Sequence, residues 1–332
     1  MKKKTVLAAL GGNAILQPKQ AATFENQMKN VIESCKFLAD LVAKGYRLVI
    51  THGNGPQVGN ILRQNEEAKD VIPPMSLDVC SAESQGFIGY MIQQALRNEL
   101  EKIGLEIPVA SLVTRVEVSI DDAAFHDPSK PIGGFYTEQE AAKLMIEKNW
   151  LVKPDANRGW RRVVPSPKPV RILESDSIMK LLDNGHIVIA CGGGGIPVVK
   201  DKDGDGVYRG VEAVIDKDLS GCKLAEQIGA DLFVILTDVE HVFINYGKEN
   251  QMALQSVSVG QLAEYVQQGQ FSKGSMGPKI EAAISFAKTG GKSIICALEK
   301  AAFALQGKSG TVVHSGLAAN HQPDVNKGKL IV

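Results

Sequence analysis

Three glycine clusters follow short apolar runs in this chain, and each has the composition to bind an anion through its backbone. They are GGNA (11–14), HGNGPQVG (52–59) and CGGGG (191–195). Backbone N–H groups at the carboxyl end of a buried strand can face anionic oxygen. One cluster alone is more typical of a turn, whereas three at the ends of successive strands predict a site for a phosphate-sized anion.

Phosphoryl transfer at such a site would also need cations, because backbone groups leave the charge of a bound phosphate uncompensated. Lys217 lies between Asp216 and Asp218, where an apolar run passes into the next helix, and Lys279 lies in GSMGPK at the start of another helix. A cation at a helix start is unfavourable unless an anion shares the position. Lys130 lies in PSKPIG. Each lysine alone is typical of a solvated surface, but together they are candidates for stabilising charge in phosphoryl transfer.

The overall charge and composition favour small-molecule partners. Lys and Arg number 37, as do Asp and Glu, so no net charge attracts nucleic acid or an anionic membrane. No stretch approaches the roughly 18 apolar residues of a membrane span, and the apolar run after MKKK is shorter than a signal peptide needs. The five cysteines contain no CxxC pair, which favours a reduced, cytoplasmic protein.

Short apolar runs alternate with amphipathic stretches along the chain. Helical spacing is seen over 24–44, 81–103 and 278–288, each followed closely by a glycine that predicts the end of a helix. Continuous apolar runs suit parallel strands that are buried on both faces. The alternation predicts an α/β fold, a three-layer αβα sandwich with a largely parallel central sheet. The runs expected to form strands are 5–10, 47–51, 108–118, 186–191, 231–237, 292–298 and 311–313.

One segment, about 119–170, interrupts this alternation with many Pro, Gly and charged residues. Because structureless loops of this length are unusual in a compact domain, it predicts a small projecting subdomain that acts as a lid. A surface excursion without function is the alternative. Residues 1–313 are expected to form one domain, followed by a tail, 314–332, to which the sequence assigns no role.

Familiar nucleotide- and metal-binding signatures fit this chain poorly. GKS occurs at 291–293 and 307–309, but neither has the glycine that a P-loop needs five positions before GK. GNGPQVG at 53–59 places its third glycine one residue late for a dinucleotide fingerprint. DKDGDGVYRGVE at 201–212 matches an EF-hand loop, but the glycines and Pro197 before it do not predict a helix. A hairpin turn is the favoured interpretation there, with calcium binding as the alternative.

Longer motifs closely resemble carbamate kinases, which are members of the amino-acid kinase superfamily. The resemblance runs in order from about residue 4 to 313, and several motifs are too long and specific to match by chance. It implies a homodimer with this fold and reversible, Mg²⁺-dependent phosphoryl transfer between ATP and carbamate, usually run from ADP and carbamoyl phosphate towards ATP. The matching motifs are GGNAIL (11–16), HGNGPQVGN (52–60), KPIGGFYT (130–137), RGWRRVVPSPKP (158–169), CGGGGIPV (191–198), GVEAVIDKD (210–218), INYGK (244–248) and GSMGPKIEAA (274–283).

The resemblance also implies roles for individual residues. Lys217 and Lys279 would neutralise the transferring phosphoryl group with Asp218 positioning them, and Lys130 would reach the substrate from the projecting subdomain. Mg²⁺ would arrive with ATP or ADP, because no run of acidic residues marks a metal cage. The residues implied to cradle the phosphoryl group are Gly11, Gly12 and Asn13; those bordering the carbamoyl group are Gly53, Asn54, Gly55, Gly193 and Gly194; those near the nucleotide are Asp238, Tyr246, Lys248 and Met276.

Three other functions stay open at this point, one of which is a calcium-binding structural protein that residues 201–212 alone would support. A different amino-acid kinase would transfer the phosphoryl group to another carboxylate or phosphate acceptor. A non-catalytic module would bind nucleotide without turnover, although the full set of lysines argues against it.

The four glycines at 192–195 carry a more specific expectation. Side chains are expected to be absent there so that the backbone can approach a small carbamoyl-sized group. A β-carbon at Gly193 or Gly194 is therefore expected to harm activity more than folding.

Overall fold

The computed structural model describes residues 3–155, 159–201, 206–272 and 274–316 of the chain. Its centre is an eight-stranded sheet in which every pair of neighbouring strands is parallel except β16 and β17. This confirms the predicted, largely parallel sheet. In spatial order the strands are β15 (Ser256–Ser258), β17 (Thr311–His314), β16 (Lys292–Ala297), β12 (Leu232–Thr237), β1 (Thr5–Leu10), β2 (Arg47–His52), β9 (Ile187–Ile189) and β3 (Val109–Ser111).

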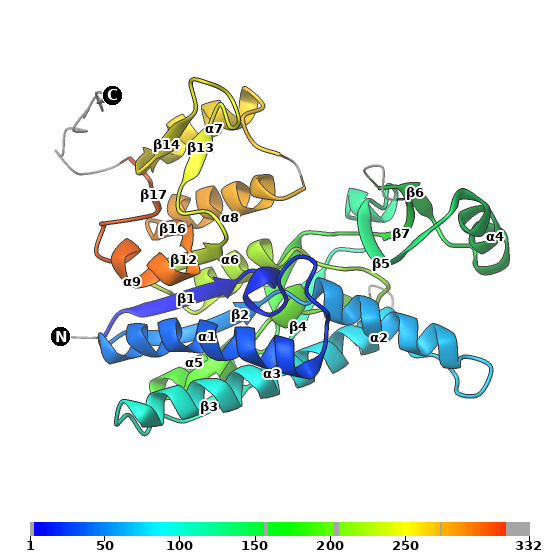
Figure 1. Cartoon of the computed structure of the whole chain (residues 1–332), viewed down its shortest axis with the longest axis horizontal. Helices are drawn as coiled ribbons and strands as arrows, with labels where there is room; N and C mark the ends of the chain where they lie inside the picture. Colours follow the sequence, from blue (N-terminus) through cyan, green and yellow to red (C-terminus); the bar gives the residue numbers. More distant parts are fainter. Residues whose placement is uncertain (1–2, 156–158, 202–205, 273, 317–332) are drawn as a thin grey trace.

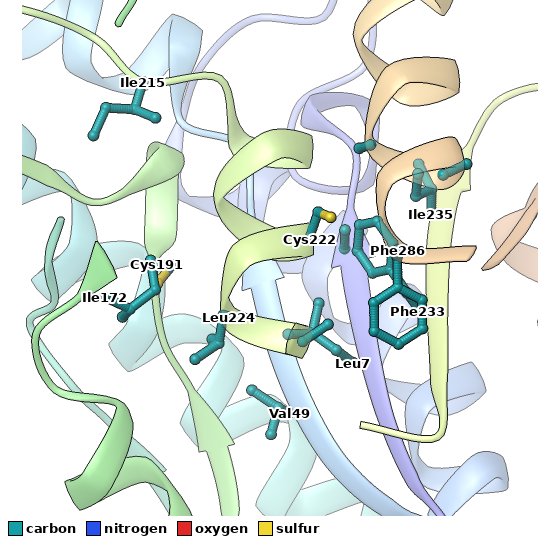
Figure 2. Close-up of a cluster of buried hydrophobic side chains, with 14 of the residues drawn as sticks. Leu7, Val49, Ile172, Cys191, Ile215, Cys222, Leu224, Phe233, Ile235 and Phe286 are labelled. Carbon is teal, nitrogen blue, oxygen red and sulfur yellow. The ribbon is translucent and has the colours of Figure 1, made fainter. Parts of the chain in front are cut away.

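Helices cover both faces of this sheet, as the predicted three-layer sandwich requires (Figure 1). Alternate residues of β1 point to opposite faces, so Leu10 packs on one side and Leu7 on the other. Figure 2 shows Leu7 beside Phe233 and Phe286, whose rings meet edge to face with centroids 5.7 Å apart. One layer holds α1 (Phe24–Ala43) and α3 (Leu77–Lys102); the other holds α5 (Ser175–Asp183), α6 (Lys217–Gln227) and α8 (Met276–Lys288).

The apolar run 108–118 does not form the single strand that was predicted. It divides into β3 of the large sheet and β4 (Arg115–Val118) of a second sheet. The chain changes sheet at Thr114, which is fully buried, and both of its backbone polar groups are hydrogen-bonded by the Gln85 amide at 2.7 and 3.2 Å. These long-range bonds stabilise the break, and the local sequence does not reveal them. The second sheet has the order β11 (Tyr208–Gly210), β10 (Ile196–Lys200), β4 and β8 (Pro169–Ile172).

The EF-hand-like sequence lies between paired strands. Strands β10 and β11 are antiparallel neighbours, which confirms the hairpin, and no helix flanks the loop within the described residues. Most of the loop tip, 202–205, lies outside the described residues. The hairpin therefore explains the Asp-Gly sequence without an EF-hand.

A small unit projects from the body of the molecule, as predicted (Figure 1). It contains a three-stranded antiparallel sheet and one helix: β5 (Lys130–Tyr136), β7 (Trp160–Val164), β6 (Val152–Pro154) and α4 (Glu138–Lys148). We refer to these elements as the projecting subdomain. Its action as a lid and the assignment of 1–313 to one domain stay predictions, and most of the tail, 317–332, lies outside the described residues.

The remaining elements connect these layers. They are α2 (Gly55–Ala68), α7 (Val259–Gln267), α9 (Ala301–Ala304), β13 (Val242–Ile244), β14 (Met252–Leu254) and the 3₁₀ turns η1 (Gly12–Ala14), η2 (Ala123–Phe125), η3 (Gly192–Gly194) and η4 (Leu298–Lys300).

No helix among the described residues is both long enough and apolar enough to cross a membrane.

Candidate active site

The three glycine clusters meet at one edge of the large sheet. Strands β1, β2 and β9 are parallel neighbours, and each is followed by one cluster. A β-carbon on Gly53 would lie 3.3 Å from the backbone N of Gly12 and 3.7 Å from Cδ of Lys217. Gly12 and Gly55 have no atoms within 4 Å of such a position, so their backbone faces open space. The geometry therefore places an accessible glycine-lined backbone beside Lys217.

A buried carboxylate joins the two lysines that begin α6 and α8. Asp218 Oδ1 accepts a hydrogen bond from Lys217 Nζ at 2.5 Å, and Asp218 Oδ2 accepts one from Lys279 Nζ at 2.9 Å. The Asp218 side chain is only 3% exposed. Burial alone would raise its pKa, but Lys217 and then Lys279 outweigh that effect and hold the pKa below the ordinary value of 3.8. At neutral pH the cluster therefore contains one carboxylate and two fixed ammonium groups, with a net positive charge.

Asp216 belongs to the same site, although it was absent from the expected site residues. Its Oδ1 accepts hydrogen bonds from the backbone N–H of Asp218 at 2.9 Å and of Leu219 at 3.4 Å, so it caps α6. Its Oδ2 accepts a hydrogen bond from Lys130 Nζ at 3.2 Å. An aspartate directly before a helix is a capping signal in the sequence, but its second contact depends on the tertiary fold.

Asn54 is turned into the protein. It precedes α2, is 6% exposed, and donates a hydrogen bond from Nδ2 to Ser84 Oγ at 2.7 Å. Ser84 Oγ in turn donates to the carbonyl of Ser81 at 2.7 Å. Polar side chains of α3 thus fix the loop that separates β2 from α2.

The four glycines at 192–195 are required by the packing of the chain itself. Gly193, Gly194 and Gly195 have φ values of 66°, 97° and 86°, which side chains rarely adopt. A β-carbon would lie 2.1 Å from Asn54 Nδ2 at Gly193 and 2.1 Å from the carbonyl oxygen of Ile215 at Gly194. The expectation that a β-carbon there harms activity more than folding is wrong on this geometry, because each substitution would displace the protein's own backbone or side chains.

His52 lies beneath the site in a neutral state. It is 1% exposed, and its Nδ1 is 3.0 Å from the carbonyl oxygen of Gly53, to which the neutral ring donates. Burial, with a smaller contribution from the nearby charge of Lys217, lowers the pKa of His52 from 6.5 to about 4, although the hydrogen bond to the Gly53 carbonyl opposes this shift. His52 therefore supports the second glycine cluster without adding charge.

This lowered pKa predicts a pH-dependent loss of stability. As pH falls from 6.5 towards 4, the unfolded state binds a proton at His52 that the folded state excludes. The free energy of unfolding should decrease by about 3 kcal/mol more in the wild type than in His52→Gln over this range. Denaturant unfolding at several pH values measures this difference, and equal losses in the two proteins would contradict it. Above pH 7 the difference between them should not depend on pH.

The expected nucleotide residues lie at the carboxyl ends of β12 and β13 and at the start of α8. Asp238 follows β12, and its Oδ2 accepts a hydrogen bond from Asn13 Nδ2 at 3.4 Å. Tyr246 is 72% exposed in the turn that follows β13, together with Lys248. Met276 is the first residue of α8 and packs partly against the core. The structure thus brings Asp238 to the first glycine cluster, while Tyr246 extends towards solvent.

The acidic groups of the site do not form a metal cage. No cluster of three or more His, Cys, Asp or Glu residues suited to a metal ion occurs in the described part of the chain. Asp216 and Asp218 are both engaged by lysines. This donor set fits a metal ion that is bound mainly by a nucleotide's own phosphates.

The fold and the site agree with the known proteins that this chain resembles. Residues 4–297 match the amino acid kinase family, and the chain belongs to that family. Within it, the chain is 53% identical to carbamate kinase from Pyrococcus horikoshii over 311 residues, covering 93% of this chain and 98% of the relative. It is 48% identical to carbamate kinase 3 from Staphylococcus aureus, with 93% and 98% coverage. These relatives confirm the resemblance to carbamate kinases that the motifs indicated.

A solved carbamate kinase structure is also similar to this chain over nearly its whole length. Carbamate kinase from Giardia lamblia bound to AMP-PNP superimposes with a TM-score of 0.89 at 45% identity, covering 94% of this chain and 98% of that one. The similarity therefore extends over nearly the whole chain.

Proposed function

We propose that this protein is a carbamate kinase, which transfers a phosphoryl group reversibly between ATP and carbamate. One observation carries the proposal: the Lys217–Asp218–Lys279 cluster, whose carboxylate is buried, lies beside the open backbone of Gly12 and next to Gly53. The chain is also about half identical to carbamate kinases over nearly their full length, which supports the same substrates.

The proposed reaction depends on charge and position. The transferring phosphoryl group passes through a loose transition state with charge on its equatorial oxygens. Lys217 and Lys279 would neutralise this charge, and Asp218 would hold the two ammonium groups in place. Gly12 and Asn13 would offer backbone N–H groups, whereas Gly11 would line the site, because its own N–H donates to the Leu236 carbonyl at 3.1 Å. Carbamate is already an anionic oxygen nucleophile and needs no general base. Catalysis is then positioning combined with electrostatic stabilisation.

The substrate pocket is proposed to include the other glycine clusters and Lys130. Gly53, Asn54 and Gly55 would border the carbamoyl group on one side, with Gly193 and Gly194 acting through their packing on Asn54 and Ile215. Lys130 would approach from the projecting subdomain. Such a pocket would favour a small acceptor.

The nucleotide is proposed to bind over the carboxyl-terminal half of the chain, near residues 236–248 and 274–276. The Giardia lamblia relative was solved bound to AMP-PNP, which supports nucleotide binding by this chain. Asp238, Tyr246, Lys248 and Met276 are the proposed contacts. Mg²⁺ would enter with the nucleotide and would supply positive charge that offsets the charge of the phosphates.

A homodimer is the proposed assembly. The resemblance implies it, and among the described residues β3 is the edge strand of the large sheet and lies beside α3. The face of α3 that carries Val79, Phe87 and Tyr90 is exposed, and these positions recur at helical spacing. A second copy packed along this edge would cover both features.

Acceptor specificity tests the proposal against other amino-acid kinases. With ATP and Mg²⁺, we expect turnover with carbamate. The rate with acetylglutamate, aspartate or UMP should be less than about one hundredth of that, because a larger acceptor that does not fit the small pocket leaves the polar groups of the site without their partners. A coupled assay for ADP formation measures each rate. Faster turnover with one of the larger acceptors would assign the protein to another branch of the family, and nucleotide binding without turnover would make it a non-catalytic module.

A further inference from the structure

The Asp216 carboxylate links the projecting subdomain to helix α6. Lys130 begins β5 of the subdomain, whereas Asp216 immediately precedes α6 in the body of the molecule. Lys130 Nζ lies 3.2 Å from Asp216 Oδ2, and the two side chains are 38% and 16% exposed. The pair is therefore partly shielded from water, and its attraction is stronger than that of a fully exposed pair.

The two oxygens of Asp216 serve different elements. Oδ1 accepts the backbone N–H groups of Asp218 and Leu219, which fixes the first turn of α6 and with it the position from which Lys217 reaches the site. Oδ2 is left for Lys130. The backbone of Asp216 is itself confined, because Gly194 packs directly against the Ile215–Asp216 peptide.

Three further ion pairs join residues 119–170 to the body of the molecule without involving Lys217 or Lys279. Lys148 pairs with Glu66 on α2, and Arg162 pairs with Glu212 before α6. Lys168 pairs with Glu281 on α8 at 2.7 Å, where both side chains are more than half exposed. These pairs attach the segment to the body but do not involve a lysine of the proposed mechanism.

We propose that Asp216 is a positioning residue that sets the Lys130 ammonium group over the site while it caps the helix that carries Lys217. The same carboxylate thus places two of the three lysines relative to each other. This inference rests on the proposed carbamate kinase activity. It adds a residue that does not itself touch the reacting atoms and acts through Lys130.

A double-mutant cycle tests this role. Asparagine caps helices as well as aspartate does, so Asp216→Asn should keep α6 while removing the ionic partner of Lys130. We expect Asp216→Asn to lower kcat/KM for carbamoyl phosphate about three- to tenfold, mainly through KM. In the Lys130→Ala background the same substitution should lower it by less than twofold, because the residue through which it acts is gone. An equal effect in both backgrounds would overturn the proposal and leave Asp216 as a helix cap only.

Two controls distinguish the loss of the Asp216–Lys130 contact from the loss of any lysine ion pair and from the loss of the helix cap. Glu281→Gln removes a matched lysine partner on α8 and should change kcat/KM by less than twofold. The melting temperature of Asp216→Asn should stay within a few degrees of the wild type, since the cap is kept. A larger kinetic effect of Glu281→Gln than of Asp216→Asn would also contradict the proposal.

Tryptophan fluorescence provides a readout that does not depend on turnover. The only two tryptophans of the chain, Trp150 and Trp160, lie at the projecting subdomain. Asp216→Asn and Lys130→Ala should produce the same change in acrylamide quenching, and the double variant should add nothing to it. If the wild-type protein forms no ATP, the proposed function fails, while this cycle still decides whether Asp216 and Lys130 act as a pair; additive or absent changes would reject the pair.

Discussion

Replacing Lys217 or Lys279 with alanine should lower kcat for ATP formation by about 10²–10³-fold, which is typical for the loss of one preorganised charge-stabilising group. Each ammonium group is held in position by a hydrogen bond to the buried Asp218 carboxylate. The loss should appear in kcat more than in KM, because the charge of the phosphoryl group develops most fully in the transition state. Steady-state kinetics of each variant measures it.

Lys223 offers a matched control on the same helix. It lies on α6 and pairs with Glu226 at 2.9 Å, away from Asp218. Lys223→Ala should retain kcat within about twofold, since it removes only a partly exposed helical ion pair. Near wild-type activity of Lys217→Ala would remove Lys217 from the mechanism, and the same outcome for Lys279→Ala would remove Lys279.

Replacing Gly194 with alanine should destabilise the fold by about 3–5 kcal/mol, which combines the strain of a positive φ with overpacking against backbone. The added β-carbon would lie 2.1 Å from the carbonyl oxygen of Ile215, and the backbone there has φ of 97°. Because Ile215 leads directly into the cap of α6, relaxation would also displace Lys217. Denaturant unfolding should show the loss of stability together with a loss of activity.

Gly12→Ala is the matched comparison in the first glycine cluster. No atom lies within 4 Å of its β-carbon position, so stability should change by less than about 1 kcal/mol. Activity should nevertheless fall, because the methyl group would occupy space that the phosphoryl group needs. If Gly194→Ala proved as stable as Gly12→Ala, the packing role of the third cluster would be incorrect.

Local patterns in the sequence predict the central sheet well. The run 5–10 was expected as a strand and β1 has the same bounds, because a strand buried on both faces is a continuous apolar run. The meeting of three glycine clusters also follows from local signals, since parallel strands place their carboxyl ends at one edge. The division of 108–118 does not follow from them, because Gln85 holds Thr114 across a long sequence separation.

In the candidate site too, local sequence patterns do not predict contacts between residues that are far apart along the chain. Lys217 and Lys279 stood out as cations at helix starts, and the structure joins them through Asp218. The contact of Asp216 with Lys130 spans 86 residues, and no local pattern contains it. In the sequence the third glycine cluster was interpreted as a loop that contacts a ligand. In the structure, Gly193 and Gly194 are required because they pack against Asn54 and Ile215, which are distant along the chain.

The most direct test of the account is formation of ATP from ADP and carbamoyl phosphate by the purified protein in the presence of Mg²⁺. A carbamate kinase should form ATP rapidly in an assay coupled to hexokinase and glucose-6-phosphate dehydrogenase. This activity should stop when EDTA removes the metal. It should be lost in Lys217→Ala but kept in Lys223→Ala. No ATP formation by a folded wild-type protein that binds ADP would contradict the proposed function.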